Sequence, residues 1–265
     1  MFEYMTLEYW LVFIIRIILE IAIFVMAIYF FLRYKNDIAA TTKDIIFISA
    51  LSIALMQLYV YLNHSVFSIN TSIILVIVFF KYYLYLLVGT KLYEEAKLKI
   101  LNKGRYPFIS YVWPILGVII WGIFVSLIVL KVFHPALSPI ARILKEKGVV
   151  DIVKYASSRY TFNLSYLFAL LVLAIKEETV CRLLLQSALL KFFSEHKFKV
   201  IVSVLLTATF WGFGHLFTTI PMWVKFIQVF ALGVPLGLLM IKRGLFACII
   251  AHFVLNLSFR FIYLN

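Results

Sequence analysis

The sequence predicts an all-α protein, a polytopic membrane helical bundle of about eight transmembrane helices. Of its 265 residues, 65% are hydrophobic and 14% are charged, and the mean hydropathy is +1.04. Soluble globular domains are about half apolar and a quarter charged, so this composition excludes that class. A transmembrane helix needs about 20 mostly apolar residues, and eight of them with short loops fit the length of this chain.

Eight apolar runs along the chain are long enough to be membrane helices. Aromatic residues cluster near several of their ends, as expected of an interfacial belt. Lysine and arginine collect in the first, third, fifth and seventh loops, which predicts that these loops share the cytoplasmic side of the membrane. The predicted helices are 10–32, 45–62, 73–92, 111–132, 162–193, 200–217, 223–241 and 245–264.

A long connector divides the predicted bundle into two halves. Residues 1–133 form an N-terminal membrane half of four helices, and residues 162–265 form a second membrane half of four. Residues 134–161 intersperse basic and apolar residues, which predicts an amphipathic segment on the membrane surface. The abundance of Ile, Phe, Tyr and Lys is compatible with a multi-pass protein of a prokaryotic plasma membrane.

The chain has a formal net charge of +13, which raises the question of nucleic-acid binding. Its basic residues lie mostly at the ends of apolar runs, where they can bind anionic lipid head groups. No stretch of the sequence is long or polar enough to form a soluble basic domain. We therefore expect membrane lipids as partners and no nucleic acid.

Two ionisable sites in the N-terminal half have a structural interpretation. Arg16 and Glu20 are four residues apart in the first predicted helix, so they share a face and can neutralise each other. Lys81 lies in the third predicted helix, and its long stem can carry the ammonium group toward the membrane surface. Neither site by itself indicates chemistry.

A denser group of charges lies midway along the fifth predicted helix, at Lys176, Glu177, Glu178 and Arg182. Each ionised residue at a helix centre costs about 2.5–3.5 kcal/mol on insertion scales, so the group costs on the order of 10 kcal/mol unless it is compensated. Glu178 and Arg182 are four residues apart and are expected to pair, whereas the residue four after Glu177 is Cys181. A buried ion-pair network that joins helices would also explain these charges.

Two later helices carry polar pairs with helical spacing. Trp211 and His215 lie four residues apart near the end of the sixth predicted helix, and His252 and Asn256 lie four apart in the eighth. A carboxylate and an imidazole that hold one water can deprotonate it and direct it at a carbonyl carbon. A second imidazole and an amide can donate hydrogen bonds to the resulting oxyanion. Together with Glu177, these groups predict amide hydrolysis within the membrane.

These residues form three motifs that resemble the CPBP family of intramembrane proteases, which includes the CAAX prenyl endopeptidases, bacteriocin-processing enzymes and Abi proteins. The resemblance covers about residues 162–264, and the motifs occur in the family's order. They are Glu177-Glu178-x-x-x-Arg182, Trp211-x-x-x-His215 and His252-x-x-x-Asn256.

The resemblance implies a glutamate-dependent intramembrane endopeptidase. In this family the first glutamate and the second motif's histidine activate water, which assigns that role to Glu177 and His215. The third motif forms the oxyanion hole, which assigns that role to His252 and Asn256. Glu178 and Arg182 would then shape and support the site.

Two positions depart from the family pattern, which usually has phenylalanine in place of Trp211 and an aromatic residue in place of Cys181. Neither change removes a catalytic group, and both are expected to alter the shape of the pocket. A thiol mechanism through Cys181 is disfavoured, because a cysteine buried among apolar residues is inert.

The expected substrate is a hydrophobic or lipidated peptide, and an unprenylated leader, signal or bacteriocin-like peptide fits as well as a prenylated one. We expect no cofactor. Glu177, His215 and His252 could in principle ligate zinc and leave a fourth position open, but the sequence lacks the His-Glu-x-x-His helix of zinc proteases.

Two other classes of protein would explain the same intramembrane charges. A non-catalytic peptide-binding or bacteriocin-immunity protein would use the cavity without hydrolysis, although loss of catalytic groups would then be expected. A transporter also carries intramembrane charges, but the sequence shows neither an inverted repeat nor paired broken helices.

Overall fold

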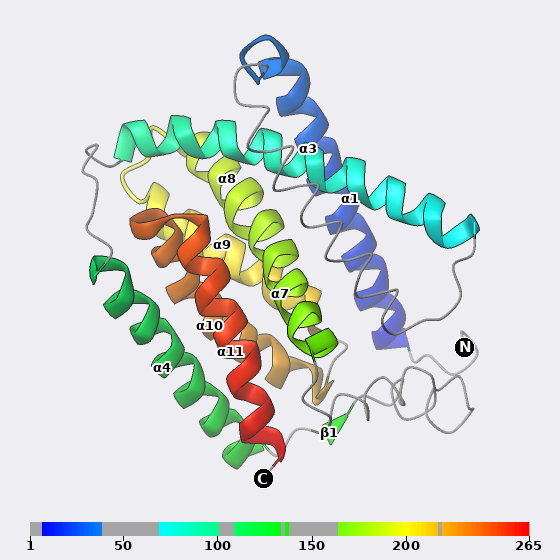
Figure 1. The fold of residues 1–265 in the computed structure, drawn as a ribbon, viewed down its shortest axis with the longest axis vertical. Coiled ribbons are helices and arrows are strands. Elements are labelled where there is room, and N and C mark those ends of the chain that lie inside the picture. The colour runs from blue at the N-terminus through cyan, green and yellow to red at the C-terminus, as the bar shows by residue number, and fades with distance from the viewer. Residues whose placement is uncertain are drawn as a thin grey trace.

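Long helices make up nearly all of the described chain, which confirms the predicted all-α class (Figure 1). The computed structural model describes residues 7–38, 69–100, 109–133, 136–137, 164–216 and 219–264. Its helices are α1 (Leu7–Ile38), α3 (Ile69–Ile100), α4 (Ile109–Phe133), α7 (Leu164–Glu178), the π-helix η3 (Thr179–Gln186), α8 (Ser187–Phe192), α9 (Lys199–Gly214), α10 (Met222–Arg243) and α11 (Leu245–Leu264).

Seven of the eight predicted helices are present in the described residues. The predicted fifth helix is a continuous run of α7, η3 and α8. The predicted helix 45–62 lies outside the described residues, and so does most of the predicted amphipathic connector 134–161.

Helix length and side-chain exposure identify a membrane protein. Within the described residues, three helical stretches are long and apolar enough to cross a membrane, Ile17–Tyr34, Ser110–Phe133 and Met222–Arg243. Large apolar side chains face outward along α4, where Trp113 is 73% and Ile120 is 66% exposed. Such surfaces suit contact with lipid, because in water they would form an extended apolar patch.

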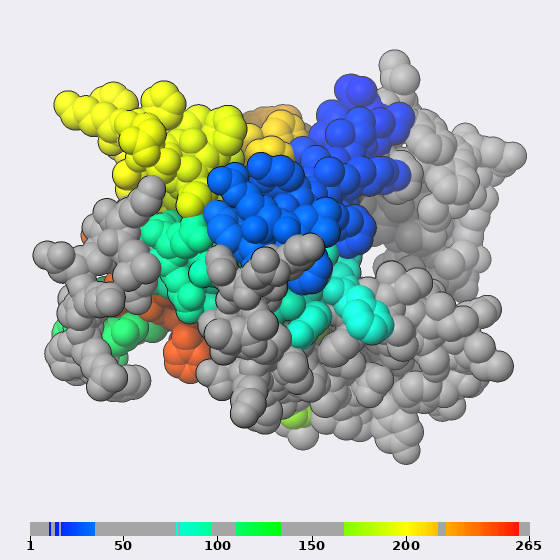
Figure 2. All heavy atoms as spheres, turned by 90° about the horizontal axis from the view of Figure 1, so that it is seen from above, coloured from blue at the N-terminus to red at the C-terminus, as the bar shows by residue number. Residues whose placement is uncertain are grey.

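The helices of the N-terminal part pack against the C-terminal helices from different sides (Figure 1). Helix α3 crosses η3 and α8, and α4 packs along α10 and α11 on the other side of the bundle. Helix α1 in turn packs on α3, as the blue and cyan spheres in Figure 2 show. The crossing of α3 over η3 is close: a Cβ atom on Gly89 would lie 2.9 Å from Leu183 Cγ, so only glycine fits there.

Polar contacts join the helix ends at each end of the bundle. At one end, the Tyr34 hydroxyl of α1 donates to the Glu95 carboxylate of α3 at 3.2 Å, and Lys191 of α8 forms an ion pair with the same carboxylate. Elsewhere, strand β1 (Ala136–Leu137) pairs antiparallel with strand β2 (Thr219–Ile220). This pairing brings together the fourth and sixth loops, as the predicted alternation of the chain across the membrane requires.

A tight glycine turn joins the last two helices. Gly244 has φ 85°, and its N–H donates to the Met240 carbonyl at 2.9 Å, which closes the end of α10. A side chain is disfavoured in this left-handed conformation. Helix α11 begins at the next residue, Leu245, and so returns along α10 toward the centre of the bundle.

Candidate active site

Three side chains from α9, its C-terminal end and α11 converge on one oxygen of Glu177, which lies near the end of α7. The indole N–H of Trp211, on α9, donates to Glu177 Oε2 at 2.6 Å. His215 Nε2, directly after α9, lies 3.6 Å from the same oxygen, and His252 Nε2 of α11 lies 3.8 Å from it. The structure therefore brings together the carboxylate and both imidazoles that the sequence predicted to form one site.

The two imidazoles are oriented by contacts at their Nδ1 atoms. His215 Nδ1 lies 2.9 Å from the Trp211 carbonyl oxygen, one turn earlier in the chain. Because a carbonyl oxygen only accepts hydrogen bonds, this nitrogen carries a proton and donates it. His252 Nδ1 likewise lies 2.8 Å from the Glu178 carboxylate. Each ring therefore directs its Nε2 atom toward Glu177.

Glu178 and Arg182 form the buried pair that their spacing predicted. Both side chains are fully buried, and Glu178 Oε2 lies 3.5 Å from Arg182 Nε. The other oxygen of Glu178 accepts the hydrogen bond from His252. One carboxylate thus connects the guanidinium group to an imidazole of the site, and its removal would leave a buried cation uncompensated.

Trp211 occupies the middle of the cluster. Its ring meets the rings of His215 and His252 edge to face, at centroid distances of 5.4 Å and 5.2 Å. The guanidinium carbon of Arg182 lies 4.7 Å from the ring centroid, within the range of a cation–π interaction. The departure from phenylalanine therefore does more than change the shape of the pocket, because only the indole ring has an N–H that can donate to Glu177.

Asn256 lies one turn beyond His252 on α11. Its Nδ2 atom is buried and has no hydrogen-bond partner among the described residues. A buried donor without an acceptor is unfavourable and therefore uncommon in folded proteins. This amide is thus available to an acceptor that comes from outside the chain, as the predicted oxyanion role requires.

The helix changes its geometry directly after the two glutamates. Residues Thr179–Gln186 form a π-helix, in which each backbone hydrogen bond joins residues about five apart, one more than in an α-helix. Gln186 at its end donates from Nε2 to the Gly237 carbonyl of α10 at 2.8 Å, which ties this segment to its neighbour. Such π segments often occur at functional sites, and the hydrophobic pattern of the sequence gave no signal for this one.

Two further residues near Glu177 were missed by the sequence analysis. Tyr82 of α3 and Lys225 of α10 both interact with Glu177 electrostatically. Lys225 lies within the predicted helix 223–241, so the rule that singled out Glu177, an ionisable residue inside an apolar helix, would also have found it. Tyr82 carried no such signal, because the chain has 16 tyrosines, many of them near predicted helix ends.

The donor set does not form a ready metal site. In the described part of the chain, no three His, Cys, Asp or Glu side chains are arranged to hold a metal ion. The oxygen of Glu177 that faces both imidazoles already accepts the Trp211 N–H at 2.6 Å. That the protein works without zinc stays a prediction.

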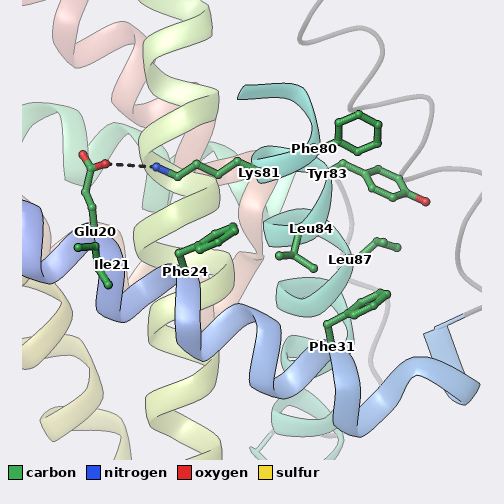
Figure 3. Close-up of a pocket in the computed structure, with 9 residues that line it drawn as sticks. All are labelled: Glu20, Ile21, Phe24, Phe31, Phe80, Lys81, Tyr83, Leu84 and Leu87. Carbon is green, nitrogen blue, oxygen red and sulfur yellow. Dashed lines mark hydrogen bonds and ion pairs between the residues drawn. The ribbon is translucent and has the colours of Figure 1, made fainter. Parts of the chain in front are cut away.

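A separate cavity of about 700 Å³ lies between α1 and α3 (Figure 3). Its polar end is the ion pair of Glu20 and Lys81, 3.2 Å apart, and the rest of its lining is mostly apolar. Lys81 therefore reaches a carboxylate on the neighbouring helix. The side chain of Arg16, the predicted partner of Glu20, lies outside the described residues. None of the predicted catalytic residues lines this cavity.

Comparison with known families agrees with this geometry. Residues 159–258 match the model of a family described as type II CAAX prenyl endopeptidase Rce1-like, and this range includes every residue of the cluster from Glu177 to Asn256. A search of curated proteins and a search of solved structures each found no match. Together, the helical fold and this match support an intramembrane protease of the CAAX type. Over residues 159–258, this match supports the CPBP family of CAAX-type proteases and confirms the resemblance of the motifs.

Proposed function

We propose that this chain is a glutamate-dependent intramembrane endopeptidase that hydrolyses a prenylated or otherwise hydrophobic peptide. The observation that carries this proposal is the convergence of Trp211, His215 and His252 on a single oxygen of Glu177. A purely structural ion-pair network would need lysine or arginine there. In the described residues, the groups within ion-pair distance of Glu177 are the two imidazoles.

Glu177 and His215 are proposed to activate the attacking water. His215 donates from Nδ1 to a backbone carbonyl, so in the neutral ring Nε2 is the acceptor, and it lies 3.6 Å from Glu177 Oε2. A water between these atoms can give up a proton as its oxygen attacks the carbonyl carbon of the peptide bond. The same proton then passes to the departing amine as the C–N bond breaks, which leaves a carboxylic acid and an amine.

His252 and Asn256 are proposed to stabilise the oxyanion of the tetrahedral intermediate. Asn256 offers a buried amide donor without a partner among the described residues. His252 can donate from Nε2 only as an imidazolium ion, since its Nδ1 proton goes to Glu178. The carboxylate of Glu178 stabilises that ion, and Arg182 holds the carboxylate in place. Such preorganised donors commonly supply a large part of catalysis.

The proposed substrate class follows from the matched family, which is described as a prenyl endopeptidase acting at CAAX motifs. In such motifs the prenylated cysteine is fourth from the C-terminus. The prenyl chain would keep the peptide in the membrane, where the site lies. An unprenylated hydrophobic peptide is the alternative that the experiment below distinguishes.

The test uses the purified chain in detergent micelles with a farnesylated peptide and its unprenylated counterpart. We expect release of the C-terminal tripeptide from the farnesylated peptide by the wild-type protein and by Glu20→Gln, but not by Glu177→Gln. Cleavage of the unprenylated peptide alone would replace the proposed substrate class. Binding of either peptide without cleavage would favour the binding or immunity role and contradict the proposed activity.

Metal dependence is tested by dialysis against a strong chelator. We expect the cleavage rate to be unchanged, because Glu177 and His215 alone can accept the proton of the water. Complete loss of cleavage that added zinc restores would contradict this mechanism and make Glu177, His215 and His252 the metal ligands.

A further inference from the structure

Lys225 is a cation beside the site to which no role has been assigned so far. It lies in the first turn of α10 and is half-buried. Its ammonium group donates to Gln228 Oε1 at 3.0 Å, and it forms no ion pair with any described residue. A lysine near the end of a membrane helix usually extends to the membrane surface, whereas the ammonium group of Lys225 contacts the buried side chain of Gln228.

The surroundings of Lys225 hold it in place without neutralising it. Gln228, which is 2% exposed, also donates from Nε2 to the hydroxyl of Ser126 on α4 at 2.8 Å. An ammonium group has three donors, and Gln228 is its hydrogen-bond acceptor within the described residues. With respect to the described residues, two donors therefore remain for a ligand.

Lys225 lies beside the site, because its neighbour Phe226 packs against Gly212, the residue after Trp211. A Cβ atom on Gly212 would lie 2.8 Å from Phe226 Cδ2. At this position the charges of Lys225 and Glu177 act on each other. The cluster contains the carboxylates of Glu177 and Glu178, and Arg182 pairs with the second of them. The other cation, Lys225, lies near Glu177 without contacting it. An anionic group of a bound substrate can therefore reach this ammonium while its peptide bond lies at Glu177.

We infer that Lys225 binds the free C-terminal carboxylate of the substrate. This inference rests on the proposed function, since a CAAX-type substrate ends a few residues after its prenylated cysteine. A carboxylate brought into an apolar bundle needs a cation as its partner, and lysine supplies a compact charge with rotatable donors. Recognition of the chain end would restrict cleavage to C-terminal motifs and spare internal peptide bonds.

The test compares two farnesylated peptides of one sequence, one ending in a free acid and one in a carboxamide, in detergent micelles. For the wild-type protein we expect kcat/KM to be about tenfold or more higher for the acid, through KM, because one charge-assisted contact is lost in the amide. In Lys225→Gln this preference should fall to about one. Lys225→Arg should retain it, and so should the matched control Lys242→Gln, an exposed lysine at the far end of α10.

Equal cleavage of acid and amide by the wild-type protein would overturn the inference while the proposed function stands. An unchanged preference in Lys225→Gln would also overturn it. Cleavage of neither peptide by the wild-type protein would contradict the proposed function itself. The comparison of acid and amide uses the wild-type protein alone. It therefore tests the inference even if Lys225→Gln does not fold.

Discussion

Glu20 and Glu177 both lie in apolar helices of this protein, and their surroundings differ. Glu20 of α1 is 57% exposed beside the cavity in Figure 3, and its carboxylate is compensated by Lys81 of α3 at 3.2 Å. Glu177 of α7 is 16% exposed, and it faces an indole N–H and two imidazoles. The first is an ordinary ion pair between two helices. The second is a carboxylate whose neighbours can exchange protons with water.

The difference shows that a charge inside a membrane helix is not by itself a sign of chemistry. Glu20 and Lys81 neutralise each other. We therefore expect substitution of either residue to lower the stability slightly and to leave the chemistry of the protein unchanged. The cluster around Glu177 differs in two ways. Its carboxylate has no lysine or arginine within ion-pair distance among the described residues, and the buried Asn256 amide has no acceptor among them. Each of the following substitutions tests one side of this comparison.

The largest effect is expected from Glu177→Gln, which preserves the size of the side chain and removes the base. Cleavage of a farnesylated peptide should fall by about 10³-fold, within the range that general acid–base groups contribute. Thermal unfolding of the variant should stay close to wild type, as the glutamine can still accept from Trp211. A variant that keeps more than a tenth of the wild-type rate would contradict the assigned role.

Asn256→Ala should lower kcat by about 10²-fold, because an oxyanion donor acts mainly in the transition state. KM should change little, since the donor is not needed for binding the ground state. Ser258→Ala is the matched control, as the Ser258 hydroxyl donates to the Val254 carbonyl of its own helix. A change in KM with kcat unchanged would show that Asn256 binds the substrate and does not stabilise the oxyanion.

Trp211→Phe should lower kcat by about tenfold through loss of the hydrogen bond to Glu177, since a bond to a charged group is worth about 1.5–3 kcal/mol. The phenylalanine ring would still fill the space between the imidazoles. Trp121→Phe removes a comparable indole hydrogen bond, to the Ala231 carbonyl, away from the site. Equal losses in both variants would mean that the effect is general destabilisation.

The smallest effect is expected from Glu20→Gln. An ion pair exposed to this degree contributes about 0–1 kcal/mol, so the melting temperature should shift by only a few degrees. The cleavage rate should stay within about twofold of wild type, because the pair lies in a separate cavity. A loss of cleavage comparable to that in Glu177→Gln would show that the two sites are coupled.

The sequence was sufficient to predict seven helices of the described residues and to single out the residues that the structure brings together around Glu177. Hydrophobic runs located the helices because lipid requires long apolar segments, and helical spacing placed Trp211 with His215 and His252 with Asn256. The pairing of Glu178 with Arg182 followed from the same spacing. These predictions depend on the spacing of residues within one helix or on charged residues within one apolar run. Both can be read from a short stretch of sequence.

The rest of the site depends on contacts between helices. The hydrogen bond from Trp211 to Glu177 joins α9 to α7, and Tyr82 approaches from α3, so neither follows from local spacing. The π-helix after Glu178 had no signal, because it differs from an α-helix in its backbone hydrogen bonds and not in a residue pattern. Lys225 could have been predicted from the sequence, because it is an ionisable residue within a predicted membrane helix.

The most direct test of the central claim compares peptides from membranes and medium of cells that carry the wild-type protein or Glu177→Gln at equal levels. Mass spectrometry of these peptides requires no assumption about the substrate. We expect a set of C-terminal fragments that is present with the wild-type protein and absent with the variant. Identical peptide profiles, with the biological phenotype preserved in the variant, would contradict proteolysis and favour a binding role for the same cluster.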